Sequence, residues 1–455
     1  MEHIYQFRNI ARVVIETITP LSVGGGEKNL LTDHVVVRDV NELPYIPGAA
    51  IAGILRHAIG EKNEKSFFGF GGDNGQGSEI IFSSAQMVDE DGRAIEGLWN
   101  TKSDYLKLFN ELPIRQHVRI NEKGTTKERG KFDEEVVYKG TRFCFEVELL
   151  SKSSEDDNFQ KVLDELAKNT LRIGGGTRKG LGEINIVECK SLHYDLCKNN
   201  DLQDYINKTS SLNDPVWDDN GNNEYHQKPA ICNTCIKNSD HYTTYELRLQ
   251  PDDFFLFGSG FGDDEADITP VFENYVDWSS GKPWFKENAI LIPGSSVKGA
   301  LSHRVAFHYN KIKKYFFGNS LAKTGGDNQA VSTLFGYASQ DEKVQKRGNM
   351  LISDVIVERQ REKTKIQNHV SIDRFTGGAI DGALFSESLV YGKGESYILT
   401  FIVLNDAIAD NEIREAFEAA LLDITQGQLP LGGGVNRGHG CFTGKVLKNG
   451  KEITK

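Results

Sequence analysis

The stretch YIPGAAIAGILRHAIG (residues 45–60) returns in altered form as LIPGSSVKGALSHRVA (residues 291–306). In both stretches the residues after the proline are apolar at helical spacing. Proline is well tolerated where a helix begins, so each stretch predicts a helix that starts at the IPG motif. Gly53 and Gly299 fall in the middle of these helices. Glycine costs about 1 kcal/mol there relative to alanine, and we expect another part of the backbone to approach closely at both positions.

Six further pairs of segments recur in the same order, at an offset that stays between 234 and 270 residues. They are LSVGGGEKNLLTD (21–33) with LFGSGFGDDEAD (256–267), FFG (67–69) with LFG (334–336), IIFSSA (80–85) with MLISDV (350–355), HVRI (117–120) with HVSI (369–372), FDEEVVY (132–138) with FSESLVY (385–391), and GGGTRKGLG (174–182) with GGGVNRGHG (432–440). Such ordered self-similarity indicates two tandem copies of one domain.

The copies are predicted to span residues 1–190 and 241–455. Residues 191–240 are rich in Asn, Asp and Lys with poor periodicity, which predicts a linker or an inserted loop. Each copy gives a β-rich run, the IPG helix, two strands, a second amphipathic helix and a last strand. That β-α-β-β-α-β order predicts an α+β fold of two tandem ferredoxin-like (RRM-type) domains.

Composition limits the class of protein. A chain of 455 residues with 38% hydrophobic and 26% charged residues is ordinary for a globular protein. The formal net charge of −12 argues against a protein that coats DNA or binds membrane surfaces, and taken alone it counts against RNA binding too. No run of about 18 apolar residues and no cleavable signal are evident, so we expect a cytoplasmic protein without a membrane partner.

Two kinds of local sequence suit the binding of a polyanion. In the loop before the last strand, three glycines are followed by Arg178 and Lys179 in the first copy, and by Asn436 and Arg437 in the second. Glycine exposes backbone N–H groups and the cations add donors, although a tight turn alone would also use glycine. A second candidate anion site is the start of the second IPG helix, with Ser295, Ser296 and Lys298 in its first turn, where serine can equally be a simple cap.

With IPGSSVKGAL, the LFG segment and the terminal GGGxxRGxG loop, each copy resembles the RAMP superfamily of CRISPR-associated proteins. The resemblance covers most of both halves and is to the backbone subunits of type III effector complexes, with the two copies similar to a type III-D-like tandem fusion. It implies a ferredoxin-like core with a β-hairpin thumb, binding of CRISPR RNA and complementary single-stranded target RNA, and assembly with other type III effector subunits.

The family resemblance also implies a cleavage site. The thumb of such subunits flips out a target base about every six nucleotides and exposes a phosphodiester beside a loop aspartate. By position Asp33 and Asp267 match that aspartate, and both stand at the same spacing from the preceding glycine loop. A carboxylate there can position Mg²⁺ or Mn²⁺, or orient the 2′-hydroxyl for attack on the adjacent phosphate. Either residue can instead be a turn residue or cap, and Asp263 and Asp264 compete for the second position.

The thumbs are expected at residues 117–138 and 369–391, and Arg374 and Phe375 in the second can contact the duplex. His117 and His369 are assigned no chemistry. In the first copy Ala49, Ala50 and Ala52 replace the Ser-Ser-x-Lys pattern, so its contact to the guide is expected to be less polar, with Arg56 as a compensating cation.

Cys232 and Cys235 form a CxxC knuckle between the copies. A tetrahedral Zn²⁺ site needs four ligands, and Cys197 and His226 are the preferred partners, although the spacing fits no clean zinc finger.

The predicted function is that of an RNA-guided, metal-dependent endoribonuclease subunit. The alternative is a non-catalytic backbone subunit that only holds guide RNA. A nuclease that processes CRISPR RNA is disfavoured because such enzymes usually use a catalytic histidine. A ferredoxin-like metabolic enzyme would need a small-molecule pocket that the sequence does not indicate.

Overall fold

The computed structural model describes residues 5–26, 32–60, 67–71, 75–99, 102–120, 125–154, 156–218, 241–316, 318–338, 345–358 and 363–454. Within them the first copy contains β1 (Phe7–Thr17), α1 (Gly48–Ile59), β2 (Ile80–Phe82), β3 (Gln86–Met87), α2 (Asp104–Lys107), β4 (Ile114–Ile120), β5 (Thr126–Glu135), β6 (Arg142–Ser151), α3 (Asp157–Leu166) and β7 (Ile184–Asp195), followed by α4 (Asn199–Asn207).

The second copy contains β8 (Tyr242–Pro251), β9 (Phe254–Phe255), β10 (Phe272–Asp277), β11 (Trp284–Ile292), α5 (Gly294–Ile312), α6 (Gln329–Phe335), β12 (Gly336–Ala338), β13 (Gln345–Arg347), β14 (Met350–Ile352), β15 (Val355–Val357), β16 (Thr364–His369), β17 (Phe385–Tyr391), β18 (Tyr397–Leu404), α7 (Asn411–Thr425), β19 (Phe442–Lys448) and β20 (Lys451–Ile453). No helix in the described ranges combines the length and the apolar character needed to span a bilayer.

The two copies have the same sheet topology. The strand order is β2-β6-β1-β7 in the first and β14-β18-β8-β19-β20 in the second, so the first strand of each copy lies between its third and last core strands. All these neighbours are antiparallel. This is the order of a ferredoxin-like unit, and it confirms the predicted α+β fold of two tandem domains.

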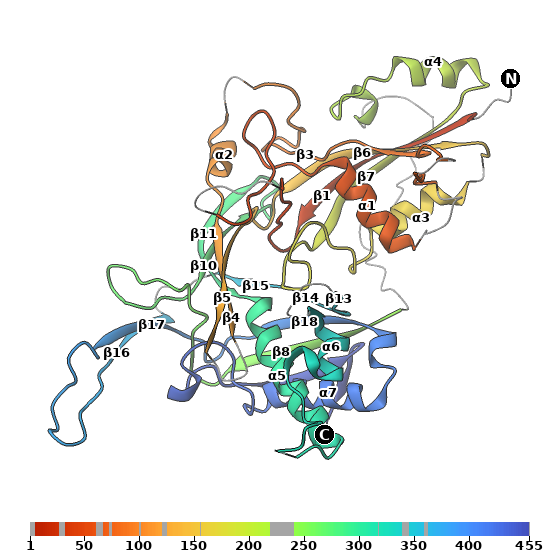
Figure 1. Cartoon of the computed structure of the whole chain (residues 1–455). Coiled ribbons are helices and arrows are strands. Elements are labelled where there is room, and N and C mark those ends of the chain that lie inside the picture. The colour runs from red at the N-terminus through yellow and green to blue at the C-terminus, as the bar shows by residue number, and fades with distance from the viewer. Residues whose placement is uncertain are drawn as a thin grey trace.

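Each sheet packs two core helices on one face, α1 and α3 in the first copy and α5 and α7 in the second (Figure 1). In the first copy Val13 and Ile15 of β1 share a buried core with Ile51 of α1 and Val162 of α3. In the second copy Leu247 of β8 lies in the equivalent core with residues of α5 and α7. The alternation of buried residues along β8 is what a strand with one helix-covered face requires, whereas β1 is buried continuously from Ile10 to Ile15.

The other face of the first sheet is also covered, by residues 196–218. Ile10 of β1 packs there against Leu192, Tyr194 and Trp217. Because Leu192 and Tyr194 are buried in this contact, β7 continues to Asp195, past residue 190 and into the stretch whose composition suggests a linker.

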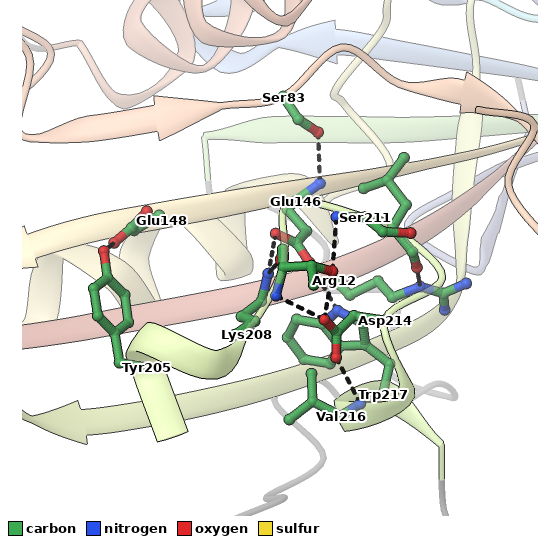
Figure 2. A network of polar contacts seen from close by, with 12 residues as sticks. Arg12, Ser83, Glu146, Glu148, Tyr205, Lys208, Ser211, Asp214, Val216 and Trp217 are labelled. Atoms are coloured by element: carbon green, nitrogen blue, oxygen red, sulfur yellow. Dashed lines mark hydrogen bonds and ion pairs between the residues drawn. The ribbon is translucent and has the colours of Figure 1, made fainter. Parts of the chain in front are cut away.

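A polar network fastens this covering segment to β6 (Figure 2). Glu146 accepts hydrogen bonds from Lys208 at 2.9 Å and from the indole N–H of Trp217 at 2.7 Å. The hydroxyl of Tyr205 donates to Glu148 at 2.8 Å. The outer face of this sheet is therefore occupied by the chain itself.

Two β-hairpins form where the thumbs were predicted. β4 pairs with β5 in the first copy and β16 pairs with β17 in the second. In both, the histidine of the first strand lies opposite the phenylalanine of the second, His117 opposite Phe132 and His369 opposite Phe385. The β16–β17 hairpin and its long connecting loop protrude from the second copy (Figure 1).

The extra residues that precede the second IPG motif form β10 and β11, an arm that reaches the first copy. Val276 of β10 is buried in the core of the first copy, and the indole N–H of Trp278 donates to the carbonyl of Gly140 at 2.8 Å. The guanidinium of Arg142 lies 3.9 Å from the centroid of the Trp278 ring. The arm thus joins the two copies through both apolar and polar contacts.

The IPG helices begin as expected, with α1 directly after Pro47 and α5 directly after Pro293. The expected close approach at Gly53 and Gly299 is wrong, because a Cβ at either position would meet nothing within 4 Å among the described residues. Close approach occurs instead at the first helical residue: a Cβ on Gly48 would lie 2.4 Å from the carbonyl oxygen of Phe82.

Candidate nucleic-acid interface

Asp33 and Asp267 occupy equivalent positions at the base of the two hairpins. The residue after each aspartate forms a parallel bridge to the second hairpin strand, His34 to Glu134 and Ile268 to Glu387. One carboxylate oxygen of Asp33 accepts the backbone N–H of Asp133 at 3.2 Å. Both aspartates are exposed.

Asp267 is held by the matching residue of the second hairpin. Its Oδ2 accepts the backbone N–H of Ser386 at 2.7 Å and the hydroxyl of Ser386 at 2.9 Å. These two hydrogen bonds lower the pKa of Asp267. The competing residue Asp263 is used within its own turn, where it accepts the N–H groups of Glu265 and Ala266. The geometry thus makes Asp267, rather than Asp263, the counterpart of Asp33.

A buried glutamate lies beside each aspartate. Glu134 is 5% exposed and lies 3.3 Å from Nε2 of His117, whose ring stacks on Phe132. Burial alone would raise the pKa of Glu134, but the hydrogen bond from His117 and the charge of Lys179 bring it below its ordinary value.

The second copy repeats this cluster with Arg437 in the place of Lys179. Glu387, fully buried, is within 3.0 Å of His369, and it accepts two hydrogen bonds from Arg437 at 3.2 and 2.6 Å. His369 stacks on Phe385, as His117 does on Phe132. Each cluster therefore ties the base of a hairpin to the Gly-rich loop of its own copy.

The Gly-rich loops carry their predicted cations to the hairpins. The ammonium of Lys179 lies 4.5 Å from the centroid of Phe132, and the guanidinium of Arg437 lies 5.6 Å from that of Phe385. The preceding residues differ between the copies. Arg178 donates to the carbonyl of Gly348 in the second copy at 2.9 Å, whereas Asn436 is exposed.

Three of the predicted RNA-binding cations meet where the two copies join. Burial lowers the pKa of Lys298 to about 8, and the nearby charges of Lys179 and Arg178 act in the same direction. Among the described residues Lys298 forms no ion pair with a carboxylate. It lies in the first turns of α5 with Ser295 and Ser296, where the N–H of Gly294 already donates to Asp354 and that of Ser296 to the carbonyl of Pro293. The result is a positively charged site at a helix start whose first N–H is bonded to the carboxylate of Asp354.

The remaining predicted RNA contacts lie elsewhere. Arg56 is in the last turn of α1. Arg374 and Phe375 are exposed in the protruding loop of the second hairpin, in a turn in which Asp373 accepts the N–H of Phe375 at 2.6 Å. At the start of α1, Ala49, Ala50 and Ala52 occupy the positions of Ser295, Ser296 and Lys298, so the first copy lacks the equivalent cation.

The predicted zinc ligands Cys232, Cys235 and His226 lie outside the described residues. Cys197 is exposed, and its N–H donates to Asp195 at 3.1 Å. Across the described ranges no group of three or more His, Cys, Asp or Glu side chains is placed to hold a metal ion. For Mg²⁺ or Mn²⁺, the loop aspartates offer one carboxylate at each site, so water or oxygens of bound RNA would have to complete the coordination sphere.

Sequence reasoning does not single out the two glutamate clusters, nor Arg115, whose guanidinium pairs with Glu273 and Asp354 of the second copy. A signal for the clusters does exist, since a histidine and a Phe-x-Glu motif recur in both hairpins (His117 with FDE, His369 with FSE). The partners of Arg115 carry no such signal, because they have no counterpart pair elsewhere in the chain.

Comparison with known families gives one match. The model of the RAMP superfamily matches residues 14–185 and residues 286–443, so the two copies are matched separately and together span more than two thirds of the chain. These ranges include both IPG helices, both hairpins and both Gly-rich loops. Asp33 lies within the match and Asp267 precedes its second part. A comparison with curated proteins gives no match.

Proposed function

Because the chain belongs to the RAMP superfamily of CRISPR-associated, RNA-binding proteins that act in complexes, we propose that it is a backbone subunit of a type III effector complex, formed as a type III-D-like tandem fusion. It binds CRISPR RNA and cleaves complementary target RNA at intervals of about six nucleotides, set by the base that each thumb flips out. The observation that carries the proposal is the aspartate held at the same place against each hairpin, Asp33 and Asp267.

Guide RNA is bound at the junction of the copies. Lys298, Lys179 and Arg178 concentrate positive charge at the start of α5, and this charge favours an anion there. A phosphate of the guide backbone supplies the missing counter-charge. It also offsets the burial of Lys298, because an adjacent anion favours the protonated amine.

Each aspartate acts on the target beside a flipped base. Its carboxylate accepts a hydrogen bond from the 2′-hydroxyl and aligns it with the adjacent phosphorus. The 2′-oxygen attacks, the bond from phosphorus to the 5′-oxygen breaks, the hydroxyl proton passes to solvent, and the leaving oxygen takes up a proton. The products are a 2′,3′-cyclic phosphate and a 5′-hydroxyl. A lowered pKa makes Asp267 a weak base, which favours this orienting role. A bound Mg²⁺ or Mn²⁺ ion would supply charge neutralisation at the phosphate.

The cleavage proposal is tested on the assembled complex with guide and labelled target RNA. Asp33→Ala and Asp267→Ala are each expected to remove a separate subset of the cuts, and the double variant to remove the cuts made by this subunit. Asp263→Ala serves as a matched control and is expected to leave the pattern intact, because that carboxylate is used within its own turn. Parallel reactions in Mg²⁺, Mn²⁺ and EDTA test the dependence on a divalent ion.

The alternative is a non-catalytic backbone subunit that only holds the guide. The hydrogen bonds from Ser386 to Asp267 favour it, since they also suit a purely structural aspartate. Cuts at about six-nucleotide spacing that survive the double substitution would remove the catalytic assignment and leave this alternative.

A further inference from the structure

We propose that Phe261 is a stacking platform for one nucleobase of the target RNA, and that it makes the cut at Asp267 prefer a purine at that base. The proposal deepens the proposed function and rests on it, because it concerns the RNA that reaches the second aspartate. It is argued from an exposed aromatic ring that shares a loop with Asp267 and lies against the hairpin of the first copy.

The ring of Phe261 is exposed, unlike its aromatic neighbours in the chain. Phe261 is 57% exposed, whereas Phe255 and Phe257 are buried in the core of the second copy. A ring that is more than half exposed gains little of the free energy that burial of apolar surface supplies. Packing of the second copy therefore does not account for an aromatic residue at this position.

The backbone of Phe261 is held by two side-chain hydroxyls of its own loop. Its N–H donates to the hydroxyl of Ser259 at 3.1 Å. Its carbonyl oxygen accepts the hydroxyl of Ser259 at 2.9 Å and that of Thr269 at 3.1 Å, and also the N–H of Thr269 at 3.2 Å. A ring that is positioned before RNA arrives loses less conformational entropy when a base stacks on it.

The turn that presents Phe261 packs against the backbone of the proposed catalytic aspartate. A Cβ on Gly262 would lie 2.4 Å from the carbonyl oxygen of Ala266 and 2.7 Å from that of Asp267. Only a residue without a side chain allows this approach, and it fixes Phe261 close to Asp267 within one loop.

The hairpin of the first copy brings a cation to the ring across the joint between the copies. The ammonium of exposed Lys131 in β5 lies 5.7 Å from the centroid of the Phe261 ring, within the range of a cation–π contact. A Cβ on Gly260 would lie 3.5 Å from the side-chain oxygen of Gln116 in β4. The joint thus places an exposed ring, a cation and Asp267 together.

This combination suits a nucleotide of single-stranded RNA. An unstacked base lies on an exposed aromatic ring, while a cation beside the ring attracts the phosphate backbone. Preferences among bases on such platforms come from stacking strength, and purines stack more strongly because their ring system is larger. The second cut is therefore expected to be faster when the stacked base is a purine.

The first copy lacks this platform. The bridge that Gly24 forms in the first copy has its counterpart at Gly258 in the second, which aligns the two loops. Three residues after these glycines the second copy has Phe261, whereas the first has Glu27, which lies outside the described residues. A glutamate offers no ring for stacking, so the cut at Asp33 is not expected to share the preference.

Stacking is tested by photo-crosslinking in the assembled complex with its guide. The probe is 5-iodouridine, which crosslinks to aromatic side chains on which it stacks, and it is moved one nucleotide at a time through the target segment. Crosslinked peptides are identified by mass spectrometry. A crosslink from one target position to Phe261 is expected, and it should be lost in Phe261→Leu and retained in Phe261→Trp.

Base preference is then measured with targets that carry each of the four bases at the crosslinked position. The wild type is expected to cut at Asp267 faster with a purine there. Phe261→Leu should lose the preference and slow that cut by about 5- to 100-fold, the effect of one lost stack. Phe261→Trp should keep the preference. The matched control is Phe316→Leu, because Phe316 is 72% exposed beyond the end of α5 and should change neither cut.

Three results would overturn the proposal. The first is no crosslink to Phe261 from any target position when the same probes crosslink elsewhere in the complex. The second is an equal slowing of the Asp267 cut for all four bases in Phe261→Leu, which indicates a structural role. The third is a loss of base preference at the cut of Asp33 instead.

Failure of this proposal is distinguishable from failure of the proposed function. Crosslinks to Phe261 that persist while Asp33→Ala and Asp267→Ala leave the cuts intact would remove only the catalytic assignment. Cuts that depend on the aspartates but not on Phe261 would remove only the stacking platform.

Discussion

The guanidinium of Arg115 and the carboxylate of Asp354 form a buried ion pair between the two copies. The other carboxylate oxygen of Asp354 accepts the N–H of Gly294, the first residue of α5, at 2.7 Å. Burial would lower the pKa of Arg115, but the charges of Glu273 and Asp354 raise it above its ordinary value. One carboxylate thus links the hairpin of the first copy to the helix start that carries Lys298 in the second.

Replacement of Arg115 by glutamine is expected to destabilise the protein strongly. Glu273 and Asp354 would remain buried without a cation, which typically costs about 3–5 kcal/mol. The free energy of unfolding from urea titration gives the measurement. Lys282→Ala is the control, because its pair with Asp91 spans the same joint but is exposed, and it should change stability by less than about 1 kcal/mol. Equal effects of the two substitutions would contradict a structural role for the Arg115 pair.

Comparison of the variants Gly180→Ala and Gly438→Ala separates two causes of destabilisation, a collision at the joint between the copies and strain in the backbone. Both substitutions place a Cβ at positive φ, which costs about 1–2 kcal/mol. Only at Gly180 does that Cβ also collide with Asp354, which adds about 1–3 kcal/mol of overpacking. Thermal unfolding should therefore give the lower Tm for the Gly180 variant. A Gly438 variant that is as unstable as the Gly180 variant would show that the surroundings of Gly438, too, are tightly packed.

Binding of guide RNA is expected to weaken as pH rises through about 8. The pKa of Lys298 is lowered to about 8, so its ammonium loses its proton in that range, and the positive charge that attracts the phosphate is lost with it. Fluorescence anisotropy with labelled guide RNA measures the affinity. Lys298→Arg keeps the charge and should flatten the pH profile. A profile as steep as that of the wild type in this variant would exclude Lys298 as the titrating group.

Lys298→Ala should also reduce the salt dependence of RNA binding. Loss of one phosphate contact lowers the slope of log affinity against log salt by about 0.7 for single-stranded nucleic acid. Lys445→Ala is a suitable control, since Lys445 is exposed and paired with Glu452 on the edge of the second sheet. The same change of slope in both variants would indicate a non-specific charge effect.

Glu134→Gln is expected to lower the free energy of unfolding at neutral pH and to change it little in acid. The pKa of Glu134 in the folded protein lies below its ordinary value of 4.5. Its ionised form therefore contributes stability above pH 4.5, and the contribution is lost as pH falls through the lowered pKa. A loss of about 1–3 kcal/mol at pH 7 is expected for a buried charged hydrogen bond. Urea unfolding of both proteins at several pH values gives the comparison, and a difference that stays constant into acid would contradict the mechanism.

The repeated parts of the fold are predictable from sequence because their causes are local. The proline before each IPG helix, the apolar alternation of β8, and the glycines with positive φ in the loop before the last strand act within a few residues. Because the two copies align, Asp33 and Asp267 also fall at matching positions in the sequence itself.

The joint is not predictable in the same way. Arg115 and Asp354 are 239 residues apart. Both are residue types that usually lie on the surface, so nothing in the sequence marks them as a buried pair. The same holds for Arg178, which aligns with Asn436 as a candidate RNA contact but serves in part to hold Gly348. Close approach of Gly48 rather than Gly53 depends on where β2 ends, which helical spacing does not specify.

The position of Val276 has a thermodynamic consequence. Its side chain is contributed by the second copy but is 3% exposed in the core of the first. Separation of the copies would leave a cavity in the core of the first copy and expose the β10–β11 arm of the second. Neither copy therefore has a complete hydrophobic core of its own. The repeats should therefore melt as a single cooperative unit, with a calorimetric enthalpy equal to the van't Hoff enthalpy. The two copies are therefore expected to behave, energetically, as one domain.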